Sequence, residues 1–100
     1  MAERMDLHRK LKTLFDNVYF QPPGHERINY PCVIYKRAAG NMKYANNQTY
    51  FFKQQYELTI ITKDPDDPRV EQILYEFPMI QRNRHFQNDN LNHDVFLLYW

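Results

Sequence analysis

The stretch YFFKQQYELTIITK, residues 50–63, decides the fold. Two sets of side chains alternate along it: the apolar positions Phe52, Tyr56, Leu58 and Ile60, and the polar positions Lys53, Gln55, Glu57, Thr59 and Lys63. Because successive side chains of a strand point to opposite faces, the alternation predicts a long strand with one packed face. The other face is expected to meet solvent or a partner. Gln54 is the one polar residue on the packed side.

Two amphipathic helices are expected on either side of this strand in the sequence. Residues 3–16 carry an apolar stripe at helical spacing, made of Leu7, Leu11, Leu14 and Phe15. Asp6 is a candidate N-cap for that helix. Residues 67–77 carry a second stripe, in which Asp67 is the expected N-cap and Pro68 the first helical position.

Shorter apolar runs predict the remaining strands. They lie at residues 17–20, 32–38, 79–86 and 93–100, and a proline-containing connection spans 21–31. The order is therefore helix, three strands, helix, two strands, which is an α+β chain. We expect a sheet of about four to five mostly antiparallel strands with two helices packed on one face.

Composition sets limits on the kind of protein. One hundred residues make one domain, 1–100. The balance of 13 basic against 12 acidic residues gives no overall electrostatic footprint for nucleic acid and leaves only a local basic patch open. Cys32, the single cysteine, lies in the apolar run YPCVIY and is expected to be buried. No apolar run reaches the roughly 20 residues of a membrane span, and no secretory signal is visible, so a cytoplasm-like compartment is expected.

A polar segment at residues 39–49, AGNMKYANNQT, is expected to be a long loop. Long loops of this kind are more often functional than decorative. The hypothesis is therefore that the segment contacts a partner, through Met42, Lys43, Tyr44 and Asn47.

The residues that could carry chemistry form no recognisable motif. His85, Asp89, His93 and Asp94 could be metal ligands, but their spacing matches no compact metal motif. The segment QNDNLNHD is better explained as a hairpin loop of five to seven residues, whose Asn and Asp side chains bond to their own backbone. The chain has no serine. We therefore expect no enzyme, no metal and no cofactor.

QRNRHF, residues 81–86, is expected to place Arg82 and Arg84 on one face of a strand beside Phe86. Arginine beside an aromatic ring is typical of protein interfaces and also of single-stranded nucleic-acid sites. The near-zero net charge favours the interface. The candidate subunit interface consists of Lys53, Gln55, Glu57, Arg82 and Arg84.

Four segments together resemble a known family: NVYFQPP after a short amphipathic helix, RINYPCVIY, YELTIITKDPDDP and the closing RHFQNDNLNHDVFLLYW. Across residues 6–100 the chain is similar to the tail terminator, or tail completion, proteins of phages with long, flexible, non-contractile tails. The family carries no residue motif that transfers to positions of this chain.

The resemblance implies an α+β subunit that assembles as a homo-hexameric ring on the end of the tail tube. The ring stops tube polymerisation and provides the surface that joins the tail to the head, without catalysis. Its partners would be the tail tube protein and the head–tail connector or stopper protein, with DNA only passing through the lumen and no membrane contact. The expected location is the neck of the virion, assembled in the cytoplasm of the host bacterium.

Two alternatives stay open from the sequence. The first is a head-completion or stopper protein, which also forms a ring in the phage neck. The second is a small module that binds single-stranded nucleic acid through Arg82, Arg84, Phe86 and Tyr50.

Overall fold

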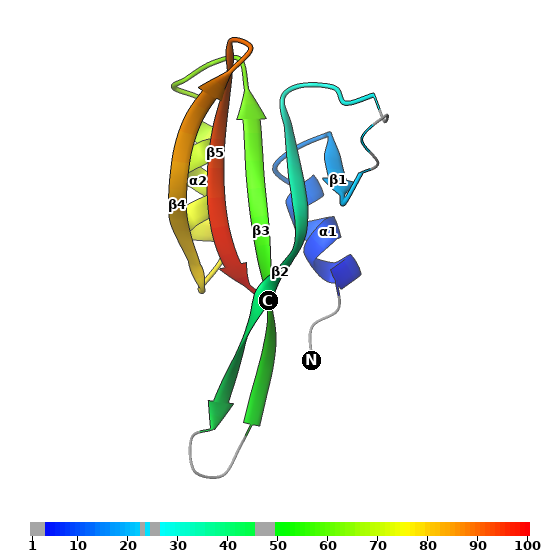
Figure 1. Ribbon diagram of the computed structural model, residues 1–100, viewed down its shortest axis with the longest axis vertical. Helices are drawn as coiled ribbons and strands as arrows, with labels where there is room; N and C mark the ends of the chain where they lie inside the picture. The colour runs from blue at the N-terminus through cyan, green and yellow to red at the C-terminus, as the bar shows by residue number, and fades with distance from the viewer. Residues whose placement is uncertain (1–3, 23, 25–26, 46–49) are drawn as a thin grey trace.

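Two helices and five strands make up the fold of the computed structural model, which describes residues 4–22, 24, 27–45 and 50–100 (Figure 1). Their order confirms the predicted α+β class and element sequence. The elements are α1 (Arg4–Lys12), β1 (Val18–Phe20), β2 (Cys32–Ala45), β3 (Tyr50–Thr62), α2 (Pro68–Glu76), β4 (Ile80–Asn88) and β5 (Leu91–Tyr99).

The strands form one sheet in the order β1-β2-β3-β5-β4, with β3 at its centre. β2, β3, β5 and β4 pair antiparallel, whereas β1 runs parallel to β2, with Val18 opposite Val33. The sheet is therefore mixed, which corrects the mostly antiparallel sheet expected from the sequence. Parallel neighbours need a crossover connection between them, and residues 21–31 supply one.

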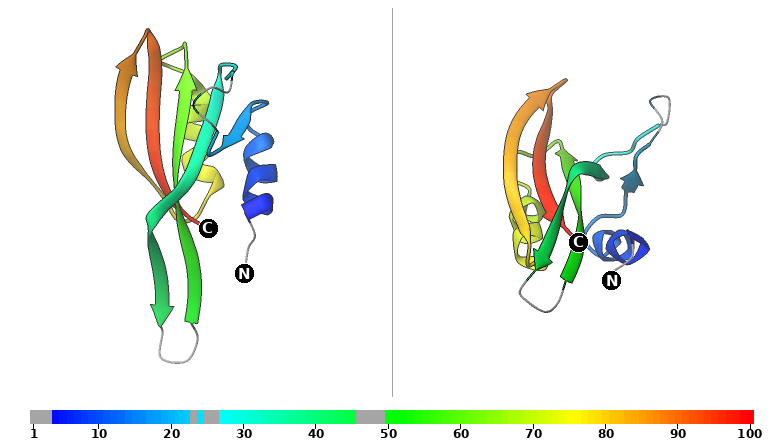
Figure 2. Two further views of the ribbon diagram at one scale, coloured as in Figure 1. Left: turned by 45° about the vertical axis from the view of Figure 1, so that its right-hand side comes forward. Right: turned by 60° about the horizontal axis from the view of Figure 1, so that its bottom comes forward.

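Both helices pack on one face of the sheet, as predicted. Leu7, Leu11 and Phe15 from the α1 segment and Val70, Ile73 and Phe77 from the α2 segment join one hydrophobic cluster. The sheet adds to this cluster the apolar side chains of its covered face: Val33, Tyr35, Tyr56, Leu58, Ile60, Phe96 and Leu98. α2 lies next to β4 and α1 next to β1, so the helices occupy opposite flanks of the sheet (Figure 2).

Two of the polar side chains on the covered face, Tyr35 and Gln54, are hydrogen-bonded within the protein. The Tyr35 side chain is fully buried; its hydroxyl lies 2.7 Å from His8 Nδ1 and accepts a hydrogen bond from Arg4 at 3.0 Å. Gln54 donates to the backbone oxygens of Ala38, at 3.1 Å, and Gln55, at 3.0 Å. Gln54, the polar exception in the alternation, therefore bonds to backbone where β2 is irregular, between Arg37 and Asn41.

Local sequence signals identify one helix start correctly and miss the other. Asp67 caps α2, accepting from the Arg69 backbone N–H at 3.0 Å, and Pro68 begins the helix as expected. Asp6 is not the cap of α1, because that helix already includes Arg4. Asp6 instead accepts from Arg9 one turn later, at 2.6 Å.

The β4–β5 connection is tighter than expected. Only Asp89 and Asn90 lie between the strands, with φ angles of 53° and 64°. Two-residue hairpin turns with positive φ at both positions favour Asn and Asp, which tolerate the left-handed conformation. The predicted loop of five to seven residues is therefore wrong, and its outer residues belong to the strands.

Residues 39–45 are not the start of a loop, which corrects that expectation. Beyond the irregularity, β2 pairs with β3 again, from Asn41 opposite Gln54 to Ala45 opposite Tyr50. This two-stranded segment leaves the body of the molecule as an arm (Figure 1). A polar sequence is compatible with a ladder of backbone hydrogen bonds, so composition alone did not distinguish arm from loop.

Cys32 is fully buried, as expected, and burial raises the pKa of its thiol to about 11. Because the thiolate is the reactive form, we expect iodoacetamide at pH 8 to alkylate the unfolded chain in urea but not the native protein. Mass spectrometry after a timed exposure measures this. Native alkylation at the unfolded rate would contradict the buried position.

Candidate functional site

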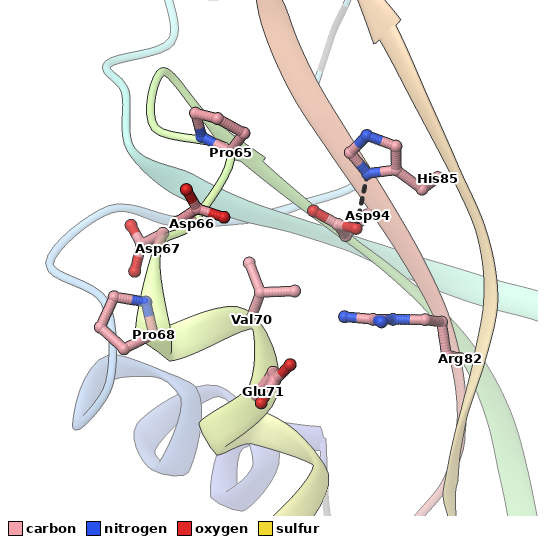
Figure 3. Close-up of a pocket in the computed structure, with 9 residues that line it drawn as sticks. All are labelled: Pro65, Asp66, Asp67, Pro68, Val70, Glu71, Arg82, His85 and Asp94. Atoms are coloured by element: carbon pink, nitrogen blue, oxygen red, sulfur yellow. Dashed lines mark hydrogen bonds and ion pairs between the residues drawn. The ribbon is translucent and has the colours of Figure 1, made fainter.

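A cleft of about 500 Å³ lies between the start of α2 and strand β4 (Figure 3). The turn before α2 and its first helical turns contribute Pro65, Asp66, Asp67, Pro68, Val70 and Glu71, and the sheet contributes Arg82, His85 and Asp94. The cleft is thus lined by four carboxylates and two basic side chains. Asp67 is already engaged, because Arg69 donates to it at 2.7 Å and lowers the pKa of its carboxyl.

The centre of the cleft is a pair formed by His85 and Asp94. His85 Nδ1 lies 2.7 Å from Asp94 Oδ1, and the carboxylate side chain is 8% exposed whereas the imidazole is 49% exposed. With Nδ1–H donating to the carboxylate, the Nε2 lone pair is left for another group. The lining residues include no hydroxyl or thiol that such a base could activate, so the pair is suited to hydrogen bonding and charge contacts.

A bulge in β4 decides which side chains reach the cleft. The register shifts between Arg82, opposite Phe96, and Arg84, opposite Val95. One extra residue in a strand reverses the alternation beyond it, so the two arginines lie on opposite faces of the sheet. The expectation that they share one face is wrong. Arg82 lines the cleft and its guanidinium lies 5.7 Å from the Phe96 ring centre, while Arg84 belongs to the opposite face.

That opposite face has no helix against it within the described residues (Figures 1 and 2). It carries Gln55 and Glu57, as the alternation predicts, together with Arg84. Phe86 stacks on His93 with ring centres 4.6 Å apart, and Arg84 lies 5.6 Å from the Phe86 ring. We call this surface the uncovered face.

The other residues of the predicted interface and contact loop fall on the arm. Lys53 pairs with Met42 along the backbone, Lys43 with Phe52, and Tyr44 with Phe51. Met42, Lys43 and Tyr44 are therefore strand residues rather than loop residues. Asn47 lies outside the described residues.

The candidate metal ligands do not form a cluster. His85 and Asp94 meet in the cleft, His93 lies on the uncovered face with Nδ1 3.2 Å from the Leu91 carbonyl, and Asp89 is in the turn. Among the described residues, no group of three or more His, Cys, Asp or Glu side chains could hold a metal ion. None of the described helices is long and apolar enough to cross a membrane.

Sequence reasoning overlooked Glu71 and Tyr75 of α2. The Tyr75 side chain is 88% exposed, more than any other large apolar side chain described, and Glu71 lines the cleft. The apolar stripe of α2 contains a signal that could have identified Tyr75. The stripe uses residues 70, 73, 74 and 77, which leaves 71 and 75 on the outer side of the helix.

Comparison with known proteins gives no relative: no family model matches the chain, and no curated protein matches it significantly.

The His85–Asp94 pair is expected to be energetically coupled. Replacing His85 by Ala leaves a buried carboxylate without its donor, which costs about 1–3 kcal/mol of unfolding free energy. In an Asp94→Leu background the same replacement is expected to cost much less, since no buried carboxylate is left unpaired. Urea unfolding of the four proteins in this cycle measures the coupling. Equal costs in both backgrounds would show that the pair contributes nothing.

Proposed function

We propose that this chain is a structural subunit of a phage neck, which assembles as a ring on the end of the tail tube, stops tube polymerisation and presents the surface for joining tail to head. The observation that carries this proposal is the arm. It is a two-stranded extension of the sheet, and the longest dimension of the molecule is 49 Å against 27 and 23 Å for the other two.

The arm supports an assembly role because of its energetics. β5 accompanies β3 only as far as Gln55 opposite Tyr99, with one further bond pair between Gln54 and Trp100. Beyond that point, the described residues of the arm pair only with each other. An isolated two-stranded hairpin is marginally stable in water, so a partner that covers the arm would stabilise it.

Two further surfaces fit a subunit of an assembly. β4 is an edge strand in which every residue after Ile80 is exposed, and the uncovered face carries Leu97 and Tyr99 beside its polar groups. A ring whose subunits contact head to tail needs two different complementary patches on each copy. The chain offers several distinct exposed surfaces rather than one cavity with reactive groups.

A head-side connector or stopper subunit would use the same kinds of surface, and the two roles differ in the partner bound. The nucleic-acid module is less well supported than the sequence suggested. Arg82 lies on the opposite face from Arg84 and Phe86, so the expected row of basic and aromatic groups is divided.

The first test of the proposal is the mass of the protein in solution and on tails. We expect light scattering to find a species of about six 12.3 kDa chains at high protein concentration. If the ring forms only on tails, purified headless tails should bind about six chains at one end. Tails capped by the protein should no longer extend when tube subunits are added. Tails that bind nothing and keep extending would exclude a tail terminator, and binding to filled heads instead would favour the stopper.

Removing the arm should separate folding from assembly. Asn41 and Gln54 are paired, so residues 42–53 can be replaced by an Asn-Gly turn that joins them directly. We expect the shortened chain to keep the circular dichroism of a folded α+β protein and to unfold cooperatively, because the described core side chains lie in the rest of the sheet. It should fail to cap tails. Capping at the level of the full chain would show that the arm has no role in assembly.

A further inference from the structure

The helical segments at the two flanks of the sheet carry opposite charge. On one side, α1 has four basic residues, Arg4, Arg9, Lys10 and Lys12, and one acidic residue, Asp6. On the other side, residues 64–76 hold five acidic residues, Asp64, Asp66, Asp67, Glu71 and Glu76, and one basic residue, Arg69. The charges of a chain with a net charge of only +1 are thus unevenly divided between these two helical segments, and Arg82 of β4 lines the cleft beside Glu71.

Contacts within the chain leave part of this charge unpaired at each flank. Arg69 already donates to the Asp67 carboxylate. Arg9 is bonded to Asp6 at 2.6 Å, but both side chains are exposed, so this ion pair neutralises the charge of Arg9 only weakly. Lys12 on α1 and Glu71 on α2 are exposed. The positive field at α1 also acts on His8, whose pKa is lowered by burial and by the charges of Arg4 and Lys12.

Each flank also exposes an apolar anchor among these charges. Tyr75 stands on the outer side of α2 with 88% of its side chain exposed, beside Glu71 and Glu76. Met5 is 41% exposed on α1. A tyrosine surrounded by polar groups is a common energetic centre of protein interfaces, because it buries a ring and keeps its hydroxyl wet.

We propose that the outer face of α2, with Tyr75, Glu71 and Glu76, docks against the outer face of α1, with Met5, Arg9 and Lys12, of a second copy of this chain. The contact is head to tail, which is the kind of contact that builds a ring when the rotation between neighbouring copies closes. Opposite charges on the two faces select this pairing and oppose like-to-like pairing. This inference rests on the ring proposed above and names its subunit contact, which leaves the uncovered face and the arm for the tube or the connector.

A charge-exchange experiment tests the contact. One variant carries Glu71→Lys and Glu76→Lys, which makes both proposed contact faces basic, and the other carries Arg9→Glu and Lys12→Glu, which makes both contact faces acidic. Each is expected to stay monomeric in light scattering at concentrations where the wild type forms rings. Mixed one to one, they should form a ring of the wild-type mass with alternating copies, because every contact then joins opposite charges.

A matched control reverses two charges on the uncovered face, Glu57→Lys with Arg84→Glu, and should keep the wild-type mass. Tyr75→Ala changes no charge and is expected to raise the protein concentration needed for ring formation at least tenfold. Circular dichroism verifies that all variants are folded. The flank contact is overturned if the single variants still form rings, if their mixture stays monomeric, or if the wild type is monomeric with and without tails.

The same samples distinguish this contact from the proposed function. Rings that depend on the flanks but do not cap tails would support the contact and refute the tail-terminator role. Tails capped equally well by the flank variants and the wild type would support the role and refute the contact. Loss of rings in the uncovered-face control alone would instead place the subunit contact on Glu57 and Arg84.

Discussion

The pairing of β3 with a strand on each side is the constraint on which the rest of the molecule depends. This strand bonds to β2 on one side and β5 on the other, so its register sets the register of both neighbours. Since its alternate side chains face opposite sides, a slip of one residue would expose Leu58 and Ile60 and bury Glu57 and Thr59. The helices can cover the sheet only because the apolar residues of all three strands fall on the same side.

The elements that could be predicted from the sequence are those whose signal is local. The alternation of residues 54–62, the apolar stripe of α2 and its Asp67–Pro68 start depend on spacing within a few residues, and the structure confirms them. The helix predicted over residues 3–16 ends at Lys12, so Leu14 and Phe15 of its apolar stripe lie beyond the helix. The turn at Asp89 and Asn90 also has a local signal, in residues that accept positive φ, but the polar sequence around it suggested a longer loop.

Features that depend on pairing between distant segments were missed. The irregularity after Arg82, which separates Arg82 from Arg84, is a property of the β4–β5 ladder, and neither arginine reveals it. The parallel pairing of β1 with β2 joins two strands that are separated by residues 21–31 in the sequence. The candidate site was likewise predicted only in part, since Asp94 was recognised as a possible ligand but its partner and its burial depend on the register with His85.

The surfaces of the molecule differ in charge, burial and shape. The flanks differ in charge, the cleft between α2 and β4 holds a buried carboxylate with its histidine, and the arm extends beyond the core. A small domain with its apolar side chains concentrated on one sheet face has little interior in which to build a reactive pocket. The variation in charge and shape then lies at its periphery, where side chains can change without cost to the core.

The open edge of β4 has a consequence for the free subunit. A nine-residue edge with unpaired backbone groups is a template to which strands of unrelated chains can add, which is how many proteins aggregate. β4 carries two of the protections that natural edges use, charged side chains on both faces and a bulge that interrupts the regular row of donors and acceptors. An edge built in this way resists indiscriminate strand addition and accepts only a strand whose shape matches the bulge.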